Sequence, residues 1–158
     1  MIYRIHIKFT TNFLGGGPRD KRSAVRHLKK TSEGAVEIHS QQFMEKLKLA
    51  NEQLDGNLDT TKFKIPDGFH AMGLITTCRR VYNKVNVDLF EGITKGKKVK
   101  LEIMYDDKVE NSPDVDIVGK LFDVIGRFHG ISQWGSKFHC GRFTVLKTEK
   151  ITIDNYDN

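Results

Sequence analysis

The sequence predicts an α+β fold in which one antiparallel sheet carries two helices on one of its faces. Three observations lead to this prediction. Residues 2–9 and 98–105 alternate between apolar and polar side chains, two other segments carry an apolar stripe at helical spacing, and glycine-rich loops separate these elements. The chain has 158 residues, which suits one domain that buries about 70% of the surface its unfolded chain exposes.

The strands are predicted from period-two patterns. In residues 2–9, Ile5, Ile7 and Phe9 fall on one face and polar side chains on the other, and residues 98–105 repeat this pattern. Residues 142–150 are predicted to form the closing strand. Residues 35–39 suit a short strand, and residues 74–87 also favour extended structure.

Two helices are predicted from apolar positions three and four residues apart. Ser40 is expected to cap a helix at 41–54, and a second helix at 114–125 begins after Ser112-Pro113. Each carries one apolar stripe, and the stripe of the second is Val115, Val118, Leu121, Phe122 and Ile125. We expect residues 56–68 to be a long connection and residues 126–141 to be irregular.

The resulting order is β-α-β-β-α-β, the ferredoxin-like arrangement. We expect one such domain at residues 1–153, with a long basic glycine loop at 13–34 and a polar tail at 154–158. This arrangement serves many functions, so the function has to be inferred from particular residues.

Charge is the most informative bulk property. The formal net charge is +6 and the isoelectric point is near 9.3, as in many proteins that bind nucleic acid. Residues 19–30 contain six Lys or Arg and one Asp, so this segment alone carries a charge of +5. It has too few apolar residues for a core helix, and we expect a loop or a short exposed helix.

Cysteine usage and the first residues indicate a cytoplasmic protein. Cys78 and Cys140 lack the spacing of a zinc site, and two free thiols are expected, with a disulfide as the alternative. Charges interrupt every apolar run in residues 1–9, which indicates neither a signal peptide nor a membrane span.

The first candidate site is the glycine run Gly15-Gly16-Gly17 with the basic segment that follows it. Glycines allow backbone N–H groups to approach a phosphate, and cations neutralise its charge. The pattern does not match a nucleotide-binding P-loop, and a solvated loop that needs glycine for its conformation is the structural alternative. The candidate binding residues here are Gly15, Gly16, Gly17, Arg19, Lys21, Arg22, Arg26, Lys29 and Lys30.

The second candidate site is residues 126–143, where aromatic and basic side chains alternate with four glycines. This composition suits single-stranded nucleic acid, because bases stack on rings while cations hold phosphates. Trp134 either offers such a ring or fills the core, whereas Phe128 and Phe143 are expected to be core residues. The candidate binding residues are Arg127, Trp134, Lys137, His139 and Arg142, and Arg79 and Arg80 extend the positive surface.

Two parts of the chain resemble known families. The first strand with Phe13-Leu14-Gly15-Gly16-Gly17, together with the glycine-rich loop at 130–141 that runs into the last strand, resembles the RAMP proteins of CRISPR systems. That resemblance implies a ferredoxin-like RNA-binding domain. The C-terminal region is also similar to small uncharacterised bacteriophage proteins that end in a G-x-G-x-W…G-R-F-x-V pattern, which implies a phage origin but no activity.

The leading prediction is therefore a phage nucleic-acid-binding protein that takes RNA or single strands. One alternative is a metal-independent RAMP-type ribonuclease that uses a histidine. The other is a phage protein that binds and inhibits a host nucleoprotein complex. No catalytic set, cofactor or metal site is predicted, since Asp106-Asp107 and Asp114-Val115-Asp116 fit turn and helix-start positions. The pattern leaves the oligomeric state open.

Overall fold

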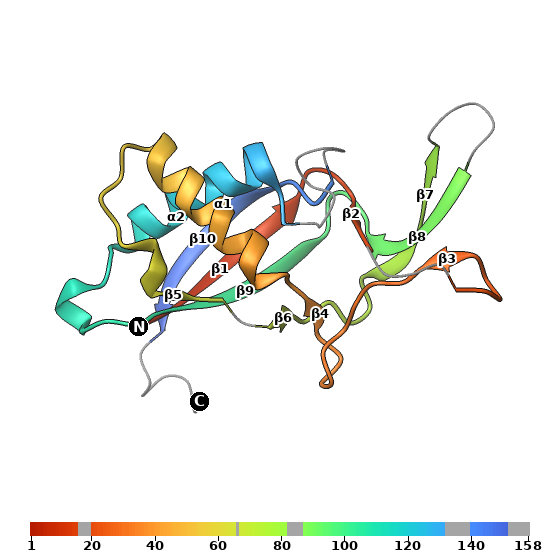
Figure 1. Cartoon of the computed structure of the whole chain (residues 1–158), viewed down its shortest axis with the longest axis horizontal. Helices are drawn as coiled ribbons and strands as arrows, with labels where there is room; N and C mark the ends of the chain where they lie inside the picture. Colours follow the sequence, from red (N-terminus) through yellow and green to blue (C-terminus); the bar gives the residue numbers. More distant parts are fainter. Residues whose placement is uncertain (16–19, 66, 82–86, 132–139, 152–158) are drawn as a thin grey trace.

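The computed structural model describes residues 1–15, 20–65, 67–81, 87–131 and 140–151. Its main sheet has the strand order β10-β1-β9-β5, and all neighbouring strands are antiparallel. These strands are β1 (Ile2–Phe9), β5 (Phe63–Lys64), β9 (Lys98–Tyr105) and β10 (Phe143–Ile151). Helices α1 (Ser40–Gln53) and α2 (Val115–Val124) cover one face of this sheet (Figure 1). The predicted fold class is confirmed.

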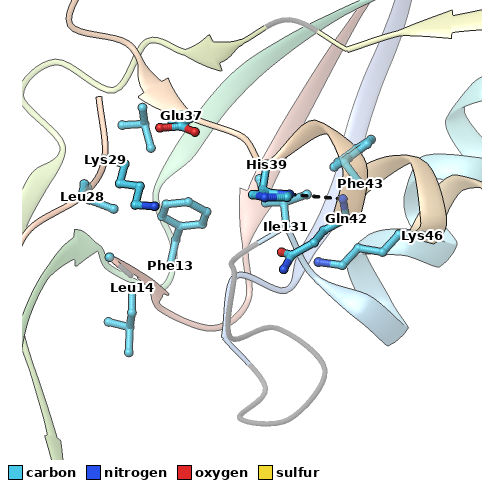
Figure 2. Close-up of a pocket in the computed structure, with 12 residues that line it drawn as sticks. Phe13, Leu14, Leu28, Lys29, Glu37, His39, Gln42, Phe43, Lys46 and Ile131 are labelled. Atoms are coloured by element: carbon cyan, nitrogen blue, oxygen red, sulfur yellow. Dashed lines mark hydrogen bonds between the residues drawn. The ribbon is translucent and has the colours of Figure 1, made fainter. Parts of the chain in front are cut away.

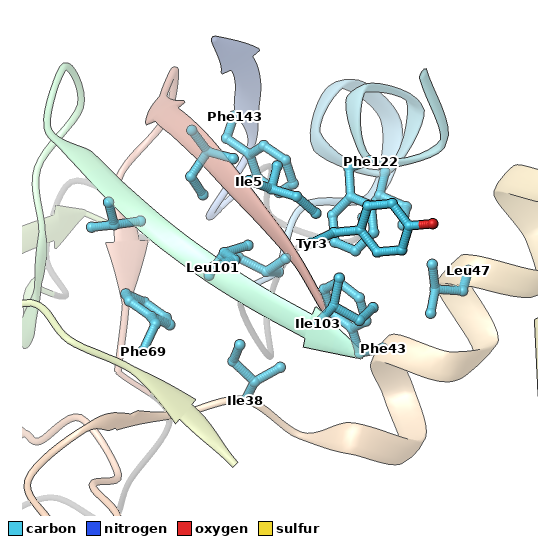
Figure 3. Packing of buried hydrophobic residues seen from close by; sticks show 14 of the residues in the cluster. Tyr3, Ile5, Ile38, Phe43, Leu47, Phe69, Leu101, Ile103, Phe122 and Phe143 are labelled. Atoms are coloured by element: carbon cyan, nitrogen blue, oxygen red, sulfur yellow. The ribbon is translucent and has the colours of Figure 1, made fainter. Parts of the chain in front are cut away.

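The core lies between the main sheet and the two helices. Tyr3 and Ile5 of β1 are fully buried and point toward the helices, where Phe122 of α2 and Leu47 of α1 meet them (Figure 3). The rings of Phe43 and Phe122 lie 5.7 Å apart and join α1 to α2. The period-two and helical patterns therefore identified the faces that pack together.

The second strand of the ferredoxin-like core is β5, which the sequence did not reveal. Residues 56–68 were expected to be a connection, but they contain a 3-10 turn (Thr60–Lys62), β5 and the start of β6 (Gly68–Phe69). Phe63 is buried and pairs with Tyr105, with ring centroids 4.9 Å apart. A two-residue strand shows no alternation, and its position depends on this packing.

The strand predicted at residues 74–87 belongs to a second sheet. It forms β7 (Ile75–Val81), which makes an antiparallel hairpin with β8 (Val87–Ile93). On its other side β8 pairs with β2 (Phe13–Leu14) and, in parallel, with β3 (Val25–Arg26). In Figure 1 this sheet lies beyond the end of the main sheet that is opposite the N-terminus. A small third sheet pairs β4 (Val36–Glu37) with β6.

Three local predictions need correction. His39, and not Ser40, caps α1, because its Nδ1 accepts a hydrogen bond from the backbone of Gln42. After α2 the chain is not irregular but continues as a π-helical turn (Ile125–His129), closed by a bond from the N–H of Gly130 to the carbonyl of Ile125. This wider turn breaks the helical spacing, so Phe128 is 60% exposed and is not a core residue.

A short 3-10 turn (Val109–Asn111) precedes α2. Among the described residues, no helix combines the length and apolar character needed to cross a bilayer.

Candidate nucleic-acid interface

The two glycine-rich segments meet at one end of the main sheet. The N–H of Thr10 donates to the carbonyl of Arg142, and the N–H of Gly141 donates to the carbonyl of Asn12, both at 2.8 Å. The N–H of Ile131 donates to the carbonyl of Gly141 at 3.1 Å. These bonds join the residues just before the first glycine-rich segment to Gly141 and Arg142, and Gly141 in turn to Ile131, on either side of residues 132–139.

Gly15 is required for close packing. It is buried, and a Cβ atom there would lie 2.7 Å from the carbonyl oxygen of His27. Its backbone N–H donates to the carbonyl of Glu91 at 2.8 Å. Glycine therefore lets the basic segment cross directly over the chain at this point. Gly16, Gly17 and Arg19 lie outside the described residues.

Asp20 and His27 hold the basic segment in a compact shape. The carboxylate of Asp20 accepts hydrogen bonds from the backbone of Arg22 and from His27, and these bonds lower the pKa of Asp20. The ring of His27 lies between Asp20 at 3.2 Å and Glu91 at 3.4 Å. Hydrogen bonds to these two carboxylates raise the pKa of His27. Sequence reasoning missed this cluster because Glu91 comes from a distant strand.

The predicted cations of this segment divide into two groups. Arg26 faces Asp88 at 4.0 Å and Lys30 faces Glu91 at 3.6 Å, so β8 supplies a carboxylate to each. The other group, Lys21, Arg22 and Lys29, is exposed, and none of the three forms an ion pair with a described residue. We call Lys21, Arg22 and Lys29 the loop cations. They present positive charge to solvent.

A small cavity lies between Lys29 and the start of α1 (Figure 2). The described residues that line this cavity enclose a volume of about 40 Å³, close to the space of one water molecule. Lys46 projects from α1 beside it and donates to the carbonyl of Gly130 at 2.8 Å, while burial lowers the pKa of its ammonium group. The cavity is too small for a nucleobase, so a ligand at this end would lie on the surface.

Close packing also shapes the second glycine-rich segment. A Cβ atom on Gly126 would lie 2.3 Å from the carbonyl oxygen of Phe143, and Phe143 is fully buried, as the sequence predicted. Arg142 is half-buried, its backbone donates to the hydroxyl of Thr11 at 2.9 Å, and its buried Nε finds no hydrogen-bond partner in the described part of the chain. Trp134, Lys137 and His139 fall outside the described residues.

Three predicted residues lie elsewhere. Arg127 pairs with Asp123 at 2.7 Å and lines a groove between α2 and β10 instead of the cavity that Lys29 lines. Arg79 is exposed on β7, opposite Leu89 of β8. Arg80 follows it in β7, but its side chain is outside the described part of the structure. The structure thus leaves Arg127 apart from the cavity that Lys29 lines, while the backbone of Arg142 contacts Thr10 and Thr11.

Cys78 and Cys140 are buried and are not joined in a disulfide, as expected. They pack with Leu14 and Phe90 and so connect the β7–β8 hairpin to the end of the second glycine-rich segment. Burial and the neighbouring Cys140 raise the pKa of Cys78.

The acidic residues considered as metal ligands have other partners. Asp106 pairs with Lys64 at 2.9 Å, and Asp107 pairs with Lys62 at 2.5 Å, which lowers the pKa of Asp107 to about 2. Within the described ranges, no three His, Cys, Asp or Glu side chains are grouped as a metal site requires.

Comparisons with known proteins identify the fold. One solved chain, from a cryo-EM structure of the type III-B Cmr-beta complex bound to cognate target RNA, superposes with a TM-score of 0.57 at 11% identity. The fold is similar to that of RAMP-type CRISPR proteins. The match covers 94% of this chain but 59% of the other, so this chain spans less than two thirds of it. A chain of a type IV-B CRISPR complex matches with a TM-score of 0.55 at 8% identity, over 99% of this chain and 98% of the other. No protein-family model and no curated protein matches the sequence.

Proposed function

We propose that this protein binds single-stranded nucleic acid, and RNA first of all, at the end of the main sheet where the two glycine-rich segments meet. One observation carries the proposal. Lys21, Arg22 and Lys29 remain exposed and without an ion pair to any described residue, and the sequence supplies Trp134 in the second glycine-rich segment as an aromatic partner. Cations hold phosphates while an aromatic ring stacks a base, which is how unpaired strands are bound without a deep pocket.

The fixed shape of the basic segment supports this proposal. Asp20 and His27 hold the segment against β8, so the loop cations project from a folded loop. Such preorganisation reduces the entropy that ordering on binding would cost. The proposed contacts are the loop cations together with Gly16, Gly17, Arg19, Trp134, Lys137, His139 and Arg142. Arg26, Lys30, Arg79, Arg80 and Arg127 would extend the positive surface, and Gly15 would act through the close packing of the basic segment against His27.

The structural neighbours favour RNA as the ligand. One of them comes from a complex bound to target RNA, and both belong to CRISPR complexes. The resemblance of the glycine-rich segments to RAMP proteins also favours RNA. We further propose one domain over residues 1–153, a phage origin from the C-terminal sequence pattern, and action in the host cytoplasm.

Three of the five described histidines give no support to a ribonuclease. His6 bonds Glu149 at 2.8 Å, His27 lies between two carboxylates, and His129 lies beside Gln53 at 3.4 Å. These three rings are on different elements and engaged with other side chains, so they do not form a catalytic pair. Binding to a nucleoprotein complex remains a second proposal, which the following experiment separates from direct binding.

The test is a binding titration with labelled single-stranded RNA. We expect the triple variant Lys21→Glu, Arg22→Glu and Lys29→Glu to weaken binding by at least about 100-fold, because reversal replaces three phosphate contacts with repulsion. The matched control reverses three other exposed lysines that form no ion pair with a described residue, Lys48, Lys108 and Lys120, and should bind within about threefold of wild type. Equal losses in both variants would show that only net charge matters and would contradict the assigned site. A wild-type protein that binds no RNA but captures a nucleoprotein complex would favour the second proposal.

A further inference from the structure

The face of the main sheet opposite the helices carries its own pattern of charge. Because side chains alternate along a strand, burial of Ile5 and Ile7 in β1 places His6 and Lys8 on the other face. The same alternation in β9 places Lys98, Lys100 and Glu102 there. No helix covers this face in Figure 1.

One half of this face is balanced by ion pairs. Arg4 pairs with Glu102 at 2.8 Å, directly across from it on β9. On the other side, Glu149 of β10 lies 2.8 Å from His6 and 2.7 Å from Lys147. The Glu149 carboxyl has its pKa lowered to about 2 by hydrogen bonds from Lys147 and then His6. Opposite charges across strands stabilise a sheet, so this half needs no ligand to explain its residues.

The other half has like charges placed opposite each other. Lys8 faces Lys98 across β1 and β9, and Lys100 lies opposite His6, which is already paired with Glu149. Lys8, Lys98 and Lys100 are exposed, and within the described part of the chain no carboxylate forms an ion pair with any of them. We call these three residues the sheet lysines. Directly opposed like charges destabilise a strand pair, so folding alone does not favour this arrangement.

The surface is hollowed beside the sheet lysines. A groove of about 620 Å³ runs between β9 and the end of β6, and it is lined by Arg4, His70, Lys98 and Lys100, with Glu102 as its acidic residue. Grooves of a few hundred cubic ångströms hold a ligand of nucleotide size. Its cationic lining fits an anionic ligand.

The sheet lysines lie at the same end of the sheet as the glycine-rich segments. The N–H of Phe9, next to Lys8, donates to the carbonyl of Lys97 at 3.0 Å, and the following residue, Thr10, bonds to Arg142 at 2.8 Å. A polymer held at the glycine-rich segments would therefore reach the sheet lysines without crossing the molecule. A small anion would not connect the two places, but a strand with regularly spaced phosphates would.

We propose that the sheet lysines and their groove form a second contact surface for the phosphate backbone of the same single strand. This inference rests on the proposed function and adds to it the path that the bound nucleic-acid strand takes over the protein surface. Short oligonucleotides would bind at the glycine-rich segments alone, and longer ones would continue onto the open face of the sheet.

The experiment compares three variants on RNAs of about 6 and about 20 nucleotides, one within and one beyond the roughly 4–16 nucleotides that a small domain usually covers. The sheet variant is Lys8→Gln, Lys98→Gln and Lys100→Gln, the loop variant is Lys21→Gln, Arg22→Gln and Lys29→Gln, and the control is Lys48→Gln, Lys108→Gln and Lys120→Gln. For the longer RNA, the slope of log affinity against log salt should become shallower by about 2 in the sheet variant, since each lost phosphate contact on a single strand removes about 0.7. Its affinity for the shorter RNA should stay at the wild-type value.

The outcomes separate the two proposals. The loop variant should lose affinity for both lengths, and the control for neither. A sheet variant with the wild-type salt slope on the longer RNA would overturn the proposed path of the strand. The proposed function would stay intact if the loop variant still loses affinity for RNA. Wild-type protein that binds neither RNA would overturn both. Equal binding of polyglutamate and the longer RNA would also overturn the inference, since an acidic polypeptide would then be the partner.

Folding is monitored by the thermal midpoint, which should not fall in the sheet variant because its substitutions remove like-charge repulsion.

Discussion

The carbonyl of Asn12 accepts a hydrogen bond of 2.8 Å from the N–H of Gly141, across 129 positions of sequence. This bond and its neighbours bring the end of the first strand against the segment that leads into the last strand. In the main sheet these two strands, β1 and β10, are adjacent. The location of the candidate interface therefore follows from the ferredoxin-like strand order, and not from the loops alone.

Gly15 provides a test of how the basic segment is held. We expect Gly15→Ala to lower the free energy of unfolding by about 1–3 kcal/mol, because its Cβ would lie 2.7 Å from the backbone carbonyl of His27, which cannot move independently. The measurement is urea unfolding. The matched control is Gly119→Ala in α2, where the nearest atom is the hydroxyl of Thr148 at 3.0 Å, which can rotate away. Alanine also favours the helix, so the control should change stability little. Equal effects of both changes would contradict the close packing at Gly15.

The elevated pKa of His27 predicts a pH dependence of stability. Protonated His27 is favoured in the folded state by Asp20 first and Glu91 second, so its folded pKa lies above the unfolded value of about 6.5. The stabilisation is complete below that value and is lost as the pH rises through the folded pKa. The thermal midpoint of wild type relative to His27→Gln should therefore be highest near about pH 6 and should decrease toward about pH 8. A difference that does not vary over this range would show that the ring forms no charge-dependent contact.

Much of the fold could be predicted because its long elements have clear periods. The apolar alternation in β1 and β9 and the stripe of α2 each extend over at least eight residues. β5 and β3 have two residues each, too few for any period, and both exist only through pairing with distant strands. For the same reason the sequence indicated a basic segment but not its internal pairs. The partners of Arg26 and Lys30, Asp88 and Glu91, become neighbours only through the parallel pairing of β3 with β8.

Substitution of Trp134 distinguishes a role in base stacking from a role in the core. It lies outside the described residues, and its place between Gln133 and Gly135 in a glycine-rich segment favours the interpretation that its ring stacks on a ligand. Trp134→Ala should weaken binding of single-stranded RNA by about 1–3 kcal/mol and leave the thermal midpoint nearly unchanged. If the indole instead fills the core, the change should cost about 3–5 kcal/mol of stability. Both quantities are measured on the same variant, and a large loss of stability with intact binding would refute stacking.

The salt dependence of RNA binding tests the central claim most directly. Affinity of the wild-type protein for a single-stranded RNA of about 6 nucleotides is measured by fluorescence anisotropy over a series of salt concentrations. With Lys21, Arg22 and Lys29 contacting three phosphates, log affinity should fall with log salt at a slope of about −2. An affinity that is the same at low and at physiological salt, or no binding at low salt, would contradict the claim that this protein holds a nucleic-acid strand by its phosphates.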